Sequence, residues 1–199
     1  MNKQQLGQFF KVNSDYILSG FSRYVRGKEV TDPFAGSGDL LIWAKKNGAK
    51  KIAGFDIDTK YIKGLNISHN DSIQNTSDYN FVLTNPPYLN VNKADKIIKE
   101  KYFTDSQYED LYQISLASVV GSKEGIVIVP INFLSAENSR LIRDIFLSTH
   151  QITRINYFRQ QVFPDTTYNV IAFHFKRSNE ILEIQTPKFI IYPDEKEIT

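Results

Sequence analysis

The chain of 199 residues has no cysteine, only three histidines and no long apolar run. Without cysteine, neither a disulfide nor a thiolate metal site can form. His69, His150 and His174 are scattered rather than spaced like metal ligands, so no metal site is expected. No stretch of about 18 apolar residues is present to span a bilayer, and the N-terminal residues lack the apolar core of a signal peptide. We therefore expect a cytoplasmic protein without a membrane partner.

An excess of one charge is also absent. The chain carries 24 Lys and Arg against 22 Asp and Glu, a formal net charge of +2. Such a balance permits a nucleic acid as a partner without arguing for one. The 41% hydrophobic content and the chain length suit one core. We expect a single domain with an N-terminal segment at 1–27, a core at 28–177 and a tail at 178–199.

Strand-like and helix-like segments alternate along the chain. A first helix is expected from Ser14, as its N-cap, to about Gly27. The central strands are nearly all apolar, and the last two have no helix between them. The pattern therefore predicts an α/β fold: a seven-stranded, mostly parallel sheet with a C-terminal antiparallel hairpin and helices on both faces. Strands are expected at 28–34, 50–58, 67–73, 80–84, 125–130, 151–158 and 168–176, and further helices at 36–49, 59–70, 106–122 and 135–149.

The segment "DPFAGSGDL" (32–40) places two glycines before an expected helix. Gly36 and Gly38 allow a tight turn and a close approach of the backbone to a ligand, and the helix N-terminus offers free N–H groups. Asp56 follows about 20 residues later at the end of the next strand, the spacing at which an acid binds the ribose of a nucleoside. The loop lacks the lysine of a P-loop, and Asp32 suits an ammonium better than a pyrophosphate. Together these features favour a nucleoside cofactor with a charged amino-acid end over a plain turn.

The segment "TNPPY" (84–88) ends an apolar strand with a rigid, polar corner. The proline after Asn85 pushes that residue into an extended conformation, and the two fixed φ angles direct the Pro86 carbonyl. The Asn85 side-chain oxygen and this carbonyl can then accept hydrogen bonds from one amine, while Tyr88 offers a ring to a flat base. Two fixed acceptors favour a tetrahedral amine nitrogen with a free lone pair. At the carboxyl end of a parallel strand, we prefer this interpretation to a plain turn.

The ordered set "LGQFF" (6–10), "DPFAGSG" (32–38), "GFDID" (54–58), "ND" (70–71) and "LTNPPY" (83–88) resembles S-adenosylmethionine-dependent DNA adenine-N6 methyltransferases of bacterial restriction-modification systems. The "GQFF" segment resembles their gamma subgroup, and the likeness covers most of residues 6–177. It implies a class I methyltransferase fold, S-adenosyl-L-methionine as cofactor, and double-stranded DNA with a flipped adenine as partner.

The resemblance also implies a role for each matching residue. Asn85, Pro86, Pro87 and Tyr88 are the implied catalytic residues, and Tyr88 and Phe163 the residues that stack on the target base. The implied cofactor-binding residues are Phe9, Phe10, Asp32, Phe34, Gly36, Gly38, Asp56, Ile57, Asp71, Ser72 and Asn85. Within this set, Asp32, Phe34 and Gly36 line the methionine end of the cofactor, Asp56 and Ile57 hold its ribose and adenine, and Asp71 meets its adenine amine.

The chain departs from the family pattern in several places. Lys11 and Val12 stand where a threonine often follows "GQFF", Asn80 stands where an acid is common, and no separate target-recognition domain is expected within the chain. The alternatives are that the chain is a catalytic fragment, that a separate target-recognition domain or subunit is a further partner, or that a small loop reads the target. Methylation of an RNA base, methylation of a protein glutamine, and a non-catalytic cofactor-binding subunit are the alternatives. The lysines at 93, 96, 99 and 101 are interpreted as a solvated helix face in preference to phosphate contacts.

Overall fold

The computed structural model describes residues 13–62, 65–163, 169–178 and 186–198. These residues form one nine-stranded sheet with strand order β3-β2-β1-β4-β5-β7-β6-β8-β9. Within the described part of the chain, no helix combines the length and apolarity that crossing a bilayer requires. The strands are β1 (Glu29–Asp32), β2 (Lys51–Asp56), β3 (Ile67–His69), β4 (Val82–Thr84), β5 (Glu124–Pro130), β6 (His150–Phe158), β7 (Val170–Arg177), β8 (Lys188–Tyr192) and β9 (Lys196–Ile198).

The first five strands are parallel, and β7 runs antiparallel to both β5 and β6, which confirms the predicted mostly parallel sheet and its antiparallel hairpin. The chain moves outward from β1 to β2 and β3, then returns to β4 on the other side of β1. The carboxyl ends of β1 and β4 therefore meet at a switch point of the strand order, where open α/β sheets bind ligands.

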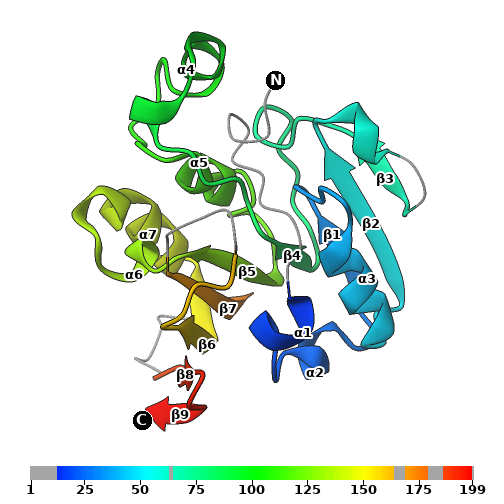
Figure 1. The fold of residues 1–199 in the computed structure, drawn as a ribbon. Coiled ribbons are helices and arrows are strands. Elements are labelled where there is room, and N and C mark those ends of the chain that lie inside the picture. The colour runs from blue at the N-terminus through cyan, green and yellow to red at the C-terminus, as the bar shows by residue number, and fades with distance from the viewer. Residues whose placement is uncertain (1–12, 63–64, 164–168, 179–185, 199) are drawn as a thin grey trace.

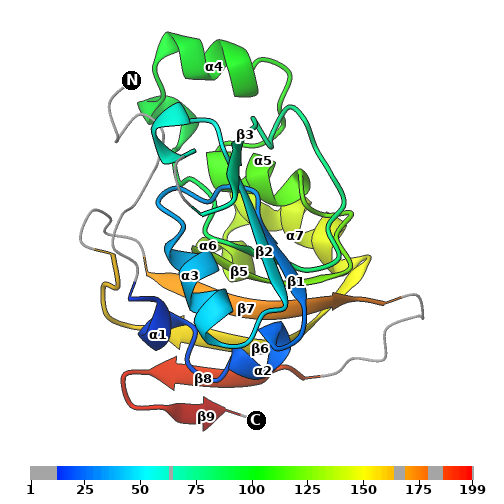
Figure 2. The same ribbon diagram turned by 90° about the vertical axis from the view of Figure 1, so that its right-hand side faces the viewer.

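Helices lie on both sides of this sheet (Figures 1 and 2). Helices α1 and α3 lie on one side, and α5, α6 and α7 on the other. Helix α4 projects beyond the carboxyl ends of the central strands. The α-helices are α1 (Ser14–Ile17), α2 (Ser22–Val25), α3 (Asp39–Lys46), α4 (Lys96–Tyr102), α5 (Leu111–Ala117), α6 (Asn132–Ser135) and α7 (Arg140–Leu147), with 3-10 turns η2 (Thr59–Tyr61), η3 (Val91–Lys93) and η4 (Glu137–Ser139).

The sheet has two more strands than the seven predicted. The additional pair, β8 and β9, forms from the segment that was assigned to the tail, and β8 pairs in parallel with β6. Ile190 and Tyr192 of β8 are buried, so this strand extends the core beyond β6. The apolar run 189–192 was visible in the sequence, but its partner residues on β6 lie 34 positions earlier, as in the pair of Arg154 with Lys188.

The single helix expected from Ser14 to about Gly27 is wrong: the structure has two short helices separated by a break. Gly20 adopts a φ of 77°, and Asn13, not Ser14, caps α1. The Ser19 carbonyl is turned out of the helix and accepts hydrogen bonds from Arg154 Nη2 (3.2 Å) and Asn156 Nδ2 (2.9 Å), both on β6. The break therefore ties the N-terminal segment to the sheet, and a Cβ at Gly20 would lie 2.5 Å from Arg154 Nη2.

Other expected helices are shorter than the sequence pattern suggested. Instead of a helix over 59–70, the described residues form the turn η2 and then β3, after Asn66 adopts a positive φ of 55°. The helix expected at 106–122 begins only after Asp110, which forms a capping box with Gln113. The helix expected at 135–149 divides into the end of α6, η4 and α7. In each case a side-chain cap or a backbone turn displaces the boundary that apolar spacing indicates.

A polar network with a buried histidine lies at the amino end of β5. His174 is buried, its Nε2 lies 3.1 Å from Glu124 Oε1, and Lys28 Nζ donates to the same carboxylate at 2.5 Å. Burial lowers the pKa of His174, although Glu124 opposes part of that shift. A histidine with a depressed pKa in the folded state stabilises the fold above its unfolded pKa of about 6.5, and this stability is lost as pH falls through the folded pKa.

We therefore expect the stability of wild type relative to His174→Gln, expressed as a difference in melting temperature, to fall as pH is lowered from 7.5 to 5.5. Thermal denaturation across this range measures the slope, with His69→Gln, at an exposed position on β3, as the matched control. An identical slope in His174→Gln and wild type would show that His174 does not carry the pH dependence.

Candidate active site

The glycine loop between β1 and α3 forms one wall of a pocket at the switch point. Gly36 and Gly38 have positive φ angles of 51° and 85°, and a Cβ on Gly38 would lie 2.6 Å from Leu65 Cδ1. The Ala35 N–H donates to the Phe55 carbonyl (2.8 Å), which joins the loop to β2. Only glycine meets both the backbone conformation and the space available at position 38.

Two buried carboxylates stand at the base of this loop. Asp32 Oδ1 accepts hydrogen bonds from Thr84 Oγ1 (2.7 Å) and the Phe34 N–H (3.1 Å), and Asp56 Oδ2 accepts from the Gly36 N–H (2.8 Å). Burial raises the pKa of Asp32 to about 7 and that of Asp56 to about 6, despite these hydrogen bonds. Both groups are therefore costly to ionise in the free protein, and a cationic or hydroxyl-bearing ligand would stabilise their charged forms.

The NPPY corner lies directly beside Asp32, at the end of β4. Asn85 is partly exposed, and its Oδ1 lies 2.5 Å from the Tyr88 hydroxyl. The same hydroxyl lies 2.8 Å from the Ile128 carbonyl on β5. The corner is thus fixed to the neighbouring strand, which positions the Asn85 amide at the mouth of the pocket.

Asp71, after β3, faces the opposite wall, which comes from α4. Its Oδ2 accepts hydrogen bonds from Lys101 Nζ (2.6 Å) and the Tyr102 hydroxyl (2.9 Å). Its Oδ1 accepts from the backbone N–H groups of Ile73 (3.2 Å) and Gln74 (3.3 Å). Burial opposes its ionisation, but the hydrogen bonds from Lys101 and Tyr102 outweigh that effect and lower the pKa of Asp71.

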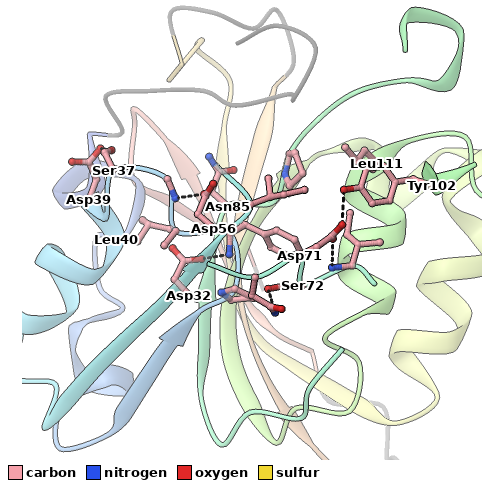
Figure 3. A pocket seen from close by; sticks show the side chains of 18 of the residues that line it. Asp32, Ser37, Asp39, Leu40, Asp56, Asp71, Ser72, Asn85, Tyr102 and Leu111 are labelled. Atoms are coloured by element: carbon pink, nitrogen blue, oxygen red, sulfur yellow. Dashed lines mark hydrogen bonds between the residues drawn. The ribbon is translucent and has the colours of Figure 1, made fainter. Parts of the chain in front are cut away.

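These walls enclose a cavity of about 870 Å³, counting the space open to solvent (Figure 3). Figure 3 shows Asp32, Asp56 and Asn85 together on one side and Asp71 pointing toward Tyr102 on the other. The structure places these predicted residues in the lining: Asp32, Phe34, Gly36, Asp56, Ile57, Asp71, Ser72, Asn85 and Pro87.

The remaining predicted residues lie elsewhere. Gly38 shapes the loop, and neither Gly38 nor the buried Pro86 is among the residues that line the pocket. Tyr88 is 5% exposed and Phe163 is fully buried, and their rings meet edge to face at a centroid distance of 6.5 Å. Both aromatic residues thus converge on the NPPY corner, and stacking on a base requires at least one ring to become exposed. Phe9 and Phe10 lie outside the described residues.

Sequence reasoning missed the wall formed by α4 and the start of α5. Ile98, Tyr102 and Leu111 line the pocket, although the lysines at 93, 96, 99 and 101 indicated only a solvated helix face in this polar stretch at 90–105. The available signal was the spacing of Ile98 and Tyr102, four residues apart and therefore on one helix face.

Comparison with known families matches residues 28–163, well over half of the 199 residues, to a family described as the Eco57I restriction-modification methylase. The chain belongs to this methylase family. The strand order and the similar solved structures likewise establish a class I S-adenosylmethionine-dependent methyltransferase fold.

Proteins similar to this chain differ in the activity that their descriptions give. The chain is 35% identical, over 85 residues, to a Methanocaldococcus jannaschii protein described as a protein N5-glutamine methyltransferase, covering 37% of this chain and 43% of that protein. A Pyrococcus horikoshii structure described as an RNA methyltransferase is 18% identical with a TM-score of 0.65, covering 89% of this chain and 90% of that one. A Vibrio vulnificus structure described as the modification subunit of a type I restriction enzyme is 17% identical with a TM-score of 0.66, covering 96% and 49%. The chain thus spans less than half of two of these proteins.

The cofactor of this methylase is S-adenosyl-L-methionine. The pocket fits it, because a buried acid with a raised pKa, a glycine loop and a second acid stand beside apolar side chains that suit an adenine. Both hydrogen bonds to Asp32 fall on Oδ1, and Oδ2 accepts none among the described residues, so Oδ2 remains for a cationic group. Asp56 and the apolar side chains of Ile57, Ile98 and Leu111 line the same cavity.

Proposed function

We propose that the methylase transfers a methyl group from S-adenosyl-L-methionine to the N6 amine of adenine in DNA, as the modification activity of a restriction-modification system. The observation that carries the proposal is the position of Asn85 at the pocket mouth, beside Asp32 and anchored through Tyr88 to Ile128. The family match to restriction-modification methylases supports a DNA substrate.

The chemistry follows from the polar corner. S-adenosyl-L-methionine supplies an electrophilic methyl group. The Asn85 side-chain oxygen and the Pro86 carbonyl accept hydrogen bonds from the two N–H groups of the amine, which favours a tetrahedral nitrogen and directs its lone pair. The nitrogen forms the N–C bond as the methyl group leaves sulfur, and the amine then loses a proton to solvent. A preorganised acceptor pair of this kind contributes about 10²–10³ in rate.

The proposed partner is double-stranded DNA with one adenine swung out of the helix. Stacking on Tyr88 and Phe163 would supply about 1–3 kcal/mol per base and help offset the cost of unstacking. A separate target-recognition domain or subunit is the further proposed partner, in keeping with the modification subunits of similar fold.

Two substrates compete with this proposal, because the similar proteins include one named for RNA and one named for protein glutamine. An NPPY corner suits an aromatic amine or an amide. The discriminating experiment offers DNA, RNA and total protein in parallel, with tritium-labelled cofactor, and measures label in each fraction. Label mainly in DNA supports the proposal, and label mainly in RNA or protein rejects it in favour of that substrate.

Removing the Tyr88 ring should weaken capture of the flipped base. We expect Tyr88→Ala to lower the population of flipped complexes by about 5- to 100-fold, the loss expected from one stacked base. The measurement is the fluorescence change of a duplex with 2-aminopurine at the target position. Tyr88→Phe, which keeps the ring, is the matched control and should retain most of the signal. An unchanged signal in Tyr88→Ala would reject the stacking role.

A further inference from the structure

Helix α4 rests on a small apolar cluster separate from the main core. Leu89, Ala94, Ile98, Phe103 and Leu111 form this cluster, against the partly buried Ile73. The main core lies around the central strands and does not include these side chains. Few apolar contacts therefore hold α4 in place, so its local opening costs less free energy than unfolding the sheet.

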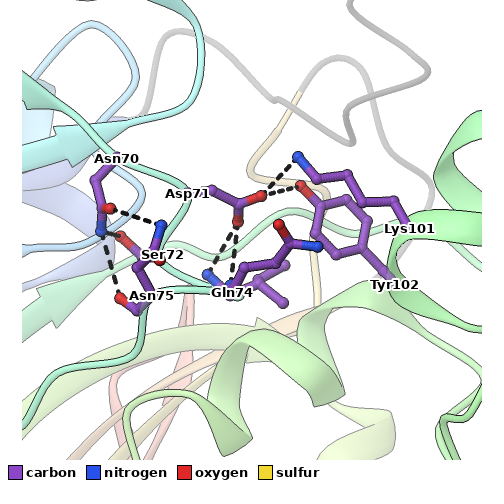
Figure 4. A network of polar contacts seen from close by, with 8 residues as sticks. Asn70, Asp71, Ser72, Gln74, Asn75, Lys101 and Tyr102 are labelled. Carbon is purple, nitrogen blue, oxygen red and sulfur yellow. Dashed lines mark hydrogen bonds and ion pairs between the residues drawn. The ribbon is translucent and has the colours of Figure 1, made fainter.

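Polar contacts join α4 to the loop after β3 across the pocket (Figure 4). Lys101 and Tyr102 both reach the same oxygen of Asp71, and two backbone N–H groups fill the other oxygen. The Asp71 side chain is only 13% exposed, and that of Lys101 is 32% exposed, so water screens the pair less than an ordinary surface pair.

The hydrogen bonds that Asp71 already accepts leave few lone pairs of its carboxylate for a ligand. A carboxylate offers about four lone-pair positions, and the contacts of Asp71 with Lys101, Tyr102 and two backbone N–H groups supply four donors. The family resemblance gives this acid one task, accepting the adenine amine of the cofactor. The contacts show a second task, because Tyr102 lines the pocket while its hydroxyl binds Asp71.

We propose that Asp71, Lys101 and Tyr102 form a latch that holds α4 as one wall of the cofactor pocket, and that Lys101 and Tyr102 are positioning residues for cofactor binding. The inference deepens the proposed function at the same site and rests on it only through the cofactor, whatever the methyl acceptor. Ile98 and Tyr102 depend on this latch to face the cofactor's base.

The variant Lys101→Met distinguishes two models: the latch, and competition between Lys101 and the cofactor for the Asp71 carboxylate. If Lys101 only occupied an acceptor that the cofactor needs, its removal would strengthen binding. The latch instead requires weaker binding, because α4 then spends more time away from the pocket. We expect S-adenosyl-L-homocysteine to bind about five- to tenfold more weakly to Lys101→Met, as measured by titration calorimetry.

Hydrogen exchange in the absence of cofactor tests the contact between Lys101 and Asp71 in the free protein. Hydrogen exchange of the amides of Ile98, Lys99 and Phe103, which are hydrogen-bonded within α4, should become faster in Lys101→Met. Lys99→Met, an exposed lysine that makes no ion pair among the described residues, is the matched control and should change neither readout. Tyr102→Phe keeps the ring and removes the second donor, so we expect a smaller change in the same direction.

A double-mutant cycle with Asp71→Asn completes the test. If the latch is one unit, Asp71→Asn and Lys101→Met together should weaken cofactor binding hardly more than Asp71→Asn alone. Additive effects, tighter binding by Lys101→Met, or unchanged exchange in α4 would each overturn the latch. None of these results depends on the methyl acceptor, so failure of the latch and failure of the DNA assignment remain distinguishable.

Discussion

Asn85→Ala is expected to lower the turnover rate by about 10²–10³ while the affinity for S-adenosyl-L-homocysteine stays within about threefold. The reason is that the amide belongs to the polar corner, which acts on the target amine, whereas the cofactor has many other contacts along the pocket. Single-turnover methylation gives the rate and calorimetry gives the affinity. A loss that appears only in the rate identifies an interaction made in the transition state.

Asn92→Ala is the matched control for this variant. Asn92 is exposed in η3, close to Asn85 in sequence but absent from the pocket lining, and its loss should change neither quantity. If Asn85→Ala transferred methyl groups as fast as Asn92→Ala, the proposed role of Asn85 would be wrong. If both rate and affinity fell together, Asn85 would be a cofactor-binding residue.

Asp32→Asn is expected to have opposite effects on binding and on stability. Removing the charge should weaken cofactor binding at pH 8 by about 30-fold or more, because a buried charge would lose its partner. The free protein should become more stable, because the ionised carboxylate is costly to bury and the amide is not. We expect a gain on the order of 2 kcal/mol at pH 8, or about 4–8 °C in melting temperature.

The direction of the stability change follows from the difference between the pKa of Asp32 in the folded protein and its usual value. The pKa of Asp32 in the folded protein, about 7, lies above its usual value of 3.8. The stabilisation that the protonated Asp32 carboxyl gives the folded state is therefore fully present below about pH 4 and is lost as pH rises through about 7. The stability gain in Asp32→Asn should accordingly shrink as pH is lowered toward 4. Asp105→Asn, at an exposed position, is the control, and a constant difference across pH would contradict the raised pKa.

Local sequence patterns predicted most of the polar residues that line the pocket. The glycine loop, Asp56 and the NPPY corner are each set by a few adjacent residues, and the parallel β1 to β5 arrangement brings their carboxyl ends together. Asp32 and Asn85 therefore meet in one pocket although they are far apart in sequence. Strand existence was also predictable, because buried strands such as β5 are continuous apolar runs.

Contacts between distant segments were not predictable in the same way. The wall formed by α4 depends on Asp71 meeting Lys101, and the break at Gly20 depends on Arg154 and Asn156 reaching the Ser19 carbonyl. In neither case does the local pattern reveal the partner. The same holds for the burial of Tyr88, whose hydroxyl meets a carbonyl on β5. Tertiary contacts thus decide where helices end and which face of a lysine-bearing segment is functional.

The most direct test of the proposed function is to identify the methylated nucleoside. The protein is incubated with tritiated S-adenosyl-L-methionine and unmethylated genomic DNA, and the DNA is digested and separated into nucleosides. We predict label in N6-methyldeoxyadenosine, and no such label with Asn85→Ala. Label in another nucleoside, or no transfer to DNA with a target-recognition partner supplied and cofactor bound, would contradict it.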